Sequence, residues 1–290
     1  MTAHSLLTRA AFVDAVGSAV LAPSLHNAQP WRFRYDDATG TVQVRSDRSR
    51  TSRTADPQGW GMRLALGAAT YNLSLAFAVA GQAMEVAWLP RNTDPELHAL
   101  LTPGPERPVT AEQERLYRAI ERRRSNRSPF HPEAVPLPAR SRITRAAREE
   151  LAWMELVTGT VPVAAVAEIT RAAQHVLERR PEYPKQPRAA WLIDGGDRAT
   201  DPLVAVLGTA GDLAIDHLRA GYALQRVLLT VTDLGLAASM FSQPIEVASA
   251  REQLRLALGR YGTPQMVLRI GYADPAAPST RRPVTDVIDD

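Results

Sequence analysis

An internal repeat constrains this fold more than any other feature of the sequence. The segment "RLALGAATYNLSLAFAVAGQAME" resembles "LRAGYALQRVLLTVTDLGLAASM" at an offset of 154 residues, which pairs Gly67 with Gly221 and Gly81 with Gly235. The first copy is apolar almost all round with small residues interspersed, as in a buried helix packed closely on another helix. A Trp-started strand, "WRFRY" or "WMELV", precedes each copy. The sequence therefore predicts two similar α+β lobes.

The lobes differ in the length of chain between the strand and the repeated helix. Trp31 to Gly67 spans 36 residues, whereas Trp153 to Gly221 spans 68, a surplus of about 32 that falls near 170–210. This surplus contains "RRPEYPKQPRAAWLIDGGDRATDP", which is rich in proline and glycine with one aromatic anchor, Trp191. Such a segment indicates an excursion or lid. We expect a first lobe at 1–110 and a second at 111–290, with a lid-like insertion near 180–205.

Local patterns place the other elements. Residues 11–22 show helical spacing and stop at Pro23. After Pro30 the period changes to two, and "DDATG" joins "WRFRY" to "TVQVRSD" as a hairpin. Short strands are expected at "MEVAWLP" and "QMVLRIGY", and a helix at 111–124. Residues 91–113, with four prolines, predict a linker or long loop.

Several kinds of chemistry are excluded by composition. The chain has no cysteine, which removes disulfides, thiolate metal sites and thiol nucleophiles. Its only lysine, Lys185, lies in a proline-rich stretch unsuited to a Schiff base. The six histidines have no paired metal-ligand spacing, and no nucleophile elbow or P-loop occurs. "GWGMRL" lacks the third glycine of a dinucleotide fingerprint. We therefore expect neither a metal site nor a Rossmann fold.

Charge and hydropathy argue against nucleic acid and membrane partners. The formal net charge is +3, and the basic residues are spread along the chain. The apolar stretch 10–22 carries Asp14 and is too short to cross a bilayer, and no basic leader precedes it. We expect a cytoplasmic protein.

Two polar clusters are candidates for a binding site. In "APSLHNAQP", Ser24, Asn27 and Gln29 stand on a loop stiffened by prolines and could read the edge of an isoalloxazine ring. In "ERRRSNRSPF", Arg123 and Arg127 with a serine between them could hold a phosphate. The alternative for the arginine cluster is a solvated helix end. Together the clusters favour a flavin nucleotide.

At these residues the chain resembles the nitroreductase superfamily. "APSLHNAQPWRF" is similar to its A-P-S-x-x-N-x-Q-P-W pattern, and "RRSNR" to its R-x-S-x-R phosphate motif. In that superfamily two identical α+β subunits interlock around each FMN, one contributing the arginine motif and the other the P-S loop. Here each lobe has one half-site and lacks the other. The resemblance, which covers essentially the whole chain, implies a fused pseudo-dimer with one FMN site, as in the Acg-type branch.

The resemblance also implies the site residues. Arg123, Ser125 and Arg127 are expected at the FMN phosphate, with Arg124 adjacent and Arg281 adding a second cation. The ring or ribityl chain is expected beside a first-lobe set: Pro23, Ser24, Leu25, Asn27 and Gln29. A backbone N–H in 239–242 is expected at flavin N5. Gln29 and Trp31 could instead fix the loop and pack the core, and His26 is expected to be structural or solvent-facing. No catalytic side chain is assigned.

Two functions remain open. In the first, the protein takes hydride from NAD(P)H at flavin N5 and reduces a small nitro or quinone acceptor. In the second, it binds FMN but turns over poorly, and stores or sequesters flavin under the lid. Both predict one flavin per chain and a monomeric pseudo-dimer.

Overall fold

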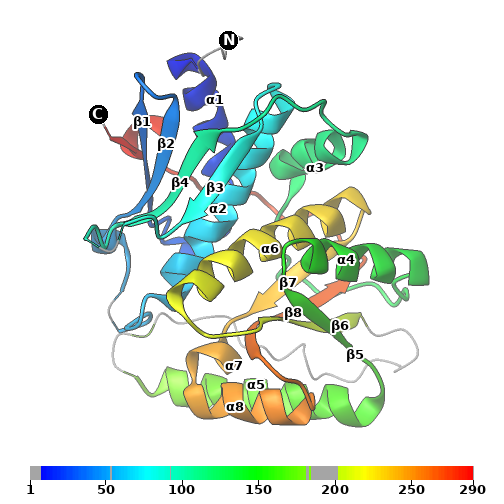
Figure 1. Cartoon of the computed structure of the whole chain (residues 1–290). Coiled ribbons are helices and arrows are strands. Elements are labelled where there is room, and N and C mark those ends of the chain that lie inside the picture. Colours follow the sequence, from blue (N-terminus) through cyan, green and yellow to red (C-terminus); the bar gives the residue numbers. More distant parts are fainter. Residues whose placement is uncertain (1–7, 53, 92, 181–182, 184–201, 290) are drawn as a thin grey trace.

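The computed structural model describes residues 8–52, 54–91, 93–180, 183 and 202–289. Two sheets, one from each half of the chain, lie on either side of a pair of long central helices (Figure 1). Most of the lid-like insertion expected near 180–205, including Trp191, lies outside the described residues. The α+β class is confirmed.

The first half of the chain supplies four strands of a sheet of order β3-β4-β2-β1-β9, and the fifth, β9 (Ile288–Asp289), comes from the C-terminus. Its elements are α1 (Arg9–Ala19), β1 (Trp31–Asp36), β2 (Thr41–Ser46), α2 (Trp60–Val79), β3 (Met84–Trp88) and β4 (Leu97–Pro103), with short 3-10 turns at Leu25–Asn27 and Arg48–Arg50. The predicted hairpin is confirmed, and its register runs from Trp31 opposite Ser46 to Asp36 opposite Thr41. Trp31, Phe33 and Tyr35 are buried, as their alternation predicted.

The expectation of a linker or long loop over residues 91–113 is wrong for part of that range, because residues 97–103 form strand β4. Leu97, Ala99 and Leu101 are buried, and the strand pairs with β2 on one side and β3 on the other. Pro95 precedes the strand and Pro103 ends it. Prolines are tolerated at strand ends, where the missing N–H breaks no central ladder bond. Pro95 and Pro103 therefore mark the limits of a strand, whereas 104–110, with the other two prolines, has neither helix nor strand, as expected.

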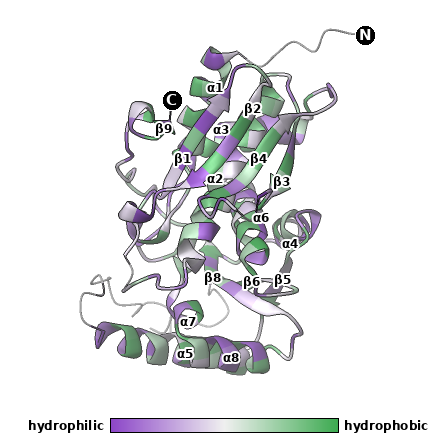
Figure 2. Ribbon diagram, turned by 60° about the vertical axis from the view of Figure 1, so that its left-hand side comes forward, coloured by the Kyte–Doolittle hydropathy of each residue, from purple (hydrophilic) through white to green (hydrophobic). Residues whose placement is uncertain are grey.

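The second half forms a sheet of order β5-β6-β8-β7. Its elements are α3 (Ala111–Arg122), α4 (Leu137–Glu149), β5 (Trp153–Val157), α5 (Thr160–Glu178), β6 (Leu203–Thr209), α6 (Ala214–Asp233), β7 (Ala237–Phe241), α7 (Gln243–Glu246), α8 (Ala248–Ala257) and β8 (Thr263–Gly271). Hydrophilic and hydrophobic residues alternate along α5 and α8, as expected of helices with one face in solvent (Figure 2).

The two sheets have the same topology. When β1, β2, β3 and β4 are matched to β5, β6, β7 and β8, the order β3-β4-β2-β1 becomes β7-β8-β6-β5, which is the second sheet read from its other edge. Helices α1 and α4 precede the matched first strands, and α2 and α6 join the matched second and third strands. The surplus of the second lobe lies between β5 and β6 and begins with α5, earlier in the chain than expected.

Helices α2 and α6 pack through glycines at equivalent positions. A Cβ on Gly67 would lie 2.0 Å from the Leu218 carbonyl oxygen, and one on Gly221 would lie 1.9 Å from the Leu64 carbonyl oxygen. Leu64 and Leu218 are themselves separated by the repeat offset, so each helix presents the same surface to the other. That is the self-complementary contact of a two-fold dimer, here built within one chain.

The C-terminal tail joins the two lobes. After β8 it crosses to the first sheet, passes through a 3-10 turn at Val284–Asp286 and ends in β9 (Ile288–Asp289), which pairs parallel with β1 (Figure 1). The first sheet is thus completed by the last residues of the second half. Helix α2 is long and apolar enough to span a membrane by composition, but 78% of its most apolar window is buried inside the protein.

Candidate functional site

A cavity of about 520 Å³ lies where the two lobes meet. Its size is that of a small-molecule or cofactor site. No aspartate or glutamate is among its described lining residues. Segments from both halves of the chain line it: 23–27, the first half of α2, 125–127, 239–243, Ser279 and Arg281. The structure therefore brings together the two motifs that lie about a hundred residues apart in the sequence.

The loop at residues 20–30, between α1 and β1, carries the Pro-Ser motif and is called the P-S loop here. Its backbone is strained. His26, Asn27 and Gln29 have φ values of 51°, 59° and 52°, in the left-handed region that residues other than glycine rarely adopt. Such strain persists only where the surrounding contacts determine the conformation, and it concentrates at functional sites.

Hydrogen bonds to the C-terminal tail hold this loop in place. Gln29 is 6% exposed, and its Oε1 accepts the Arg282 backbone N–H at 2.8 Å. The Asn27 side chain donates to the Thr280 carbonyl at 3.1 Å and accepts from Arg281 Nη1 at 3.0 Å. Within the loop, the Gln29 backbone N–H donates to Ser24 Oγ at 3.0 Å. The tail of the second lobe thus shapes the binding loop of the first.

The predicted loop residues divide into two groups. Pro23, Ser24, Leu25 and Asn27 line the cavity, and so does His26. Gln29 is not among the lining residues, because its amide is used to connect the loop to the tail. Trp31 is fully buried in the core of the first lobe. For Gln29 and Trp31 the structure favours the loop-fixing and core-packing alternatives.

Arg123 is a buried cation with unused hydrogen-bond donors. Its side chain is 4% exposed, and Nη2 donates to the Leu21 carbonyl at 3.3 Å. Nε and Nη1 are buried and have no partner in the described part of the chain. Burial, reinforced by the nearby Arg281 and Arg124 guanidiniums, lowers the pKa of Arg123 to about 9.

Arg281 approaches the same place from the tail. Its Nη2 donates to the Leu21 carbonyl at 3.5 Å and to the Ala22 carbonyl at 3.1 Å, while its Nε has no partner among the described residues. Burial and the neighbouring Arg124 lower the pKa of Arg281. Arg124 Nη1 donates to the Glu121 and Arg123 carbonyls, and within the described ranges no ion pair joins Arg123, Arg124 or Arg281 to a carboxylate. Arg123 and Arg281 meet at the Leu21 carbonyl with unused donors and no counter-ion, which suits them to a multiply charged anion.

The arginine motif runs alongside the second sheet. Ser125 forms a parallel bridge with Ala238, the Asn126 N–H donates to the Ala238 carbonyl at 2.8 Å, and Ser239 Oγ donates to the Asn126 carbonyl at 2.9 Å. Ser125 and Arg127 line the cavity, and so do residues 239–242, where we expect the contact to flavin N5. Arg123 and Arg124 are not among the lining residues; Arg123 lies beside the lining residue Arg281, since both donate to the Leu21 carbonyl.

The sequence motifs missed one wall of the cavity. Trp60, Gly61, Leu64, Ala65 and Ala68 of α2 line it, and the Trp60 indole donates to Gln265 Oε1 at 2.8 Å. The repeat identified α2 only as a packing helix. The start of α2 lies next to the P-S loop only because of tertiary contacts, so no signal in the sequence pointed to these lining residues.

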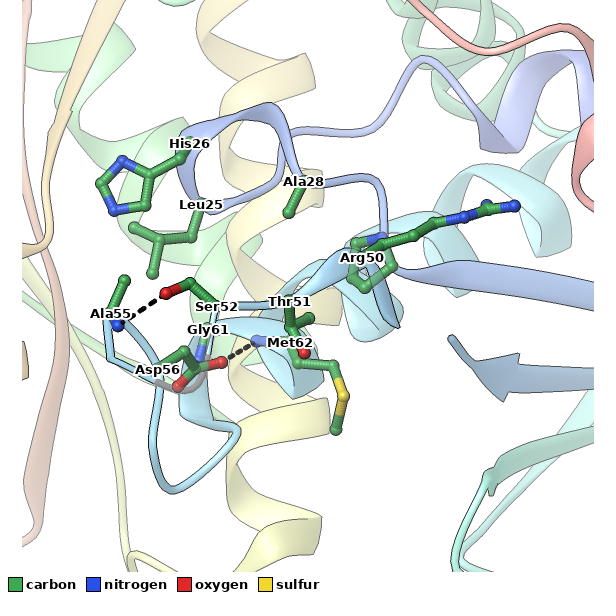
Figure 3. A pocket seen from close by; sticks show the side chains of 11 residues that line it. Leu25, His26, Ala28, Arg50, Thr51, Ser52, Ala55, Asp56, Gly61 and Met62 are labelled. Carbon is green, nitrogen blue, oxygen red and sulfur yellow. Dashed lines mark hydrogen bonds between the residues drawn. The ribbon is translucent and has the colours of Figure 1, made fainter. Parts of the chain in front are cut away.

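A smaller cavity of about 180 Å³ adjoins the loop and shares Leu25, His26 and Gly61 with the larger one. Figure 3 shows Leu25 and His26 on one side of it and Asp56 and Gly61 on the other. The Asp56 carboxylate accepts the backbone N–H groups of Gly61 (3.2 Å) and Met62 (2.8 Å), which satisfies the first turn of α2. In the described ranges no cluster of His, Asp and Glu could hold a metal ion.

The second lobe has no counterpart of the P-S loop. The loop occupies residues 20–30 between α1 and β1, whereas only 150–152 join α4 to β5. Three residues leave no room for a similar loop, which fits the absence of its motif from that part of the sequence.

Two curated relatives match most of this chain. A Mycobacterium tuberculosis protein named "Putative NAD(P)H nitroreductase Rv3131" is 30% identical, over 93% of this chain and 89% of its own length. Another from that organism, "Putative NAD(P)H nitroreductase acg", is 27% identical over 98% and 96%. The crystal structure of the FMN- and NADPH-dependent nitroreductase NfnB from a sphigopyxis strain is 23% identical, with a TM-score of 0.45, and covers 60% of this chain and 97% of that one. No family model matches.

Proposed function

This chain belongs to the NAD(P)H nitroreductase family, and we propose that it binds one FMN between its lobes and reduces a small nitro or quinone acceptor with NAD(P)H. The observation that carries the proposal is the convergence of two half-sites on one cavity. The P-S loop comes from the first lobe and the arginine motif from the second.

The residues present fit FMN. Arg123 and Arg281 have buried, unpartnered guanidinium nitrogens where a phosphate needs donors, and Ser125 and Arg127 line the cavity beside them. Apolar residues of α2 provide the surface that an isoalloxazine ring requires. We assign the phosphate to the arginine motif and Arg281, and the ring or ribityl chain to Pro23, Ser24, Leu25 and Asn27. When bound, FMN supplies hydride acceptance and electron transfer.

The remaining residues position these groups. Gln29 and the tail fix the P-S loop, and a loop held by such hydrogen bonds loses less ordering entropy when it binds a ligand. Because both half-sites lie in one chain, we propose that the monomer is complete and binds one flavin. A cytoplasmic location fits a protein that draws on NAD(P)H.

A second candidate function is flavin storage with slow turnover. It is favoured by Tyr183, which comes from the insertion between β5 and β6 and lies edge-on to the His26 ring at a centroid separation of 5.6 Å. The insertion therefore touches the P-S loop at a residue that lines the cavity.

A visible spectrum followed by anaerobic NADPH addition separates the two functions. A yellow protein whose flavin absorbance is bleached faster than that of free FMN in the same mixture supports the reductase. One that stays yellow supports storage. Failure to bind added FMN refutes both, and two flavins per chain refute the single-site assignment.

A further inference from the structure

The proposed reaction consumes a proton, but the cavity wall offers no carboxyl group to supply it. For a quinone the balance is NAD(P)H + H⁺ + quinone → NAD(P)⁺ + hydroquinone. The dihydronicotinamide is oxidised by two electrons and the quinone is reduced. NAD(P)H contributes one hydrogen as hydride, and the other arrives as a proton. No aspartate or glutamate is among the described lining residues, and burial lowers the pKa of the one imidazole among them, His26, so a carboxyl group behind the wall is the candidate proton source.

Glu246 is a carboxyl group placed directly behind that wall. It is the last residue of α7, whose first residue, Gln243, lines the cavity together with Ser242. The Tyr183 hydroxyl donates to Glu246 Oε2 at 2.8 Å. Oε1 is buried and has no hydrogen-bond partner in the described part of the chain. A buried carboxylate oxygen without a donor is costly, and protonation removes most of that cost.

The surroundings of Glu246 favour its neutral form. Burial has the largest influence on its pKa and raises it. Hydrogen bonds from the Ser242 and Tyr183 hydroxyls lower the pKa, and the smaller effects of the Asp56 carboxylate and of Arg180 raise and lower it, respectively. Charged side chains on the helices that pack against α7 have partners of their own: Glu178 with His175, Arg251 with Asp212 and Glu252 with Arg255. The His26 imidazole lies edge-on to the Tyr183 ring, and burial lowers its pKa.

We propose that Glu246 is the proton store of this site, held by Tyr183 behind the cavity wall, and that it supplies the proton that accompanies reduction of the acceptor. The inference rests on the proposed function. The carboxyl O–H bond breaks, the proton ends on the acceptor oxygen, and the carboxylate recovers a proton from solvent. Tyr183 tunes the group, since its hydroxyl stabilises the carboxylate form.

The first test uses the protein without flavin. Infrared difference spectra across a pH titration should show one carboxyl group that deprotonates above the ordinary range of glutamate. The Glu246→Gln variant should lack that signal, and Glu252→Gln, which removes an exposed carboxyl on α8, should retain it. If no such carboxyl exists, or if it survives in Glu246→Gln, the proposal is overturned.

The second test follows quinone reduction by the flavin-loaded protein against pH. In the wild type the rate should fall as pH rises through the pKa of Glu246, because only the protonated group donates. Glu246→Gln should lose this pH dependence and on the order of 10²-fold in rate, the lower end of general-acid contributions. A pH profile identical to that of the wild type would overturn the proposal.

Tyr183→Phe gives an independent result if Glu246→Gln folds poorly. Removing the hydroxyl takes away a hydrogen bond to the carboxylate form, so the falling limb of the profile should move to higher pH. An unmoved limb contradicts the assignment. If the wild type fails to bind FMN, the proposed function fails, whereas the infrared titration still reports on Glu246.

Discussion

Replacing Arg123 by methionine should change the stability of the flavin-free protein and its affinity for FMN in opposite directions. Lowering the pKa of this guanidinium from its ordinary value to about 9 corresponds to about 4–5 kcal/mol of disfavoured charge, at about 1.4 kcal/mol for each pKa unit. The side chain is 4% exposed, so solvent screens little of this cost. Methionine has a similar length and no charge, and it should recover part of that energy.

For the flavin-free protein we expect Arg123→Met to raise the free energy of unfolding by about 1–3 kcal/mol. This is less than the full cost of the buried charge, because the substitution also removes the contacts of the arginine side chain. For FMN we expect affinity to fall by about 1.5–3 kcal/mol, which is about 10-fold to 150-fold in Kd, the value of a charge-assisted contact. Urea unfolding gives the first quantity and flavin fluorescence titration the second.

Arg122→Met is the matched control, since Arg122 is exposed on the same turn of α3 and its Nε donates only to the Arg118 carbonyl. It should leave both quantities within about 0.5 kcal/mol of the wild type. If Arg123→Met destabilises the flavin-free protein and leaves FMN affinity unchanged, Arg123 is a structural residue, and the reasoning from its unpartnered nitrogens is refuted.

Three further changes test the fold and its pH response. Gly67→Ala should lower the free energy of unfolding by about 3 kcal/mol or more, because its Cβ would lie 2.0 Å from a carbonyl oxygen of α6, whereas Gly17→Ala meets nothing within 4 Å and should be neutral or stabilising in thermal unfolding. His98 is 4% exposed with a pKa lowered by burial to about 4, against 6.5 when unfolded, so protonation favours the unfolded chain and stability should fall between pH 6.5 and 4. His98→Gln should flatten that part of the curve of unfolding free energy against pH; an unchanged curve would argue against a neutral buried imidazole. Gln29→Leu leaves a tail N–H unpaired and should cost about 1–3 kcal/mol of stability and also weaken FMN binding, and wild-type values for both would show that the tail does not shape the loop.

Local patterns in the sequence predicted much of this molecule. The period-two run at Trp31–Tyr35 gave the hairpin, and the glycine spacing of the repeat gave the two central helices, because these signals depend on neighbours within one element. Strand β4 was missed because the prolines around it are typical of a loop, and only pairing with β2 and β3 explains the burial of Leu97 and Leu101.

The sequence by itself determined the family, and it predicted the duplication and the division of the site into two half-motifs, since each of these is a matter of residue type and spacing. It also predicted a single site, because each lobe lacks the motif of the other. Only the tertiary structure decided which contacts hold the two half-motifs in place. Gln29 bonds to a residue 253 positions away, and Arg123 and Arg281 meet at the Leu21 carbonyl. Glu246 lies beside Tyr183 through folding alone. No local pattern encodes such contacts, because they form only when folding brings distant segments together and their buried polar groups must find hydrogen-bond partners.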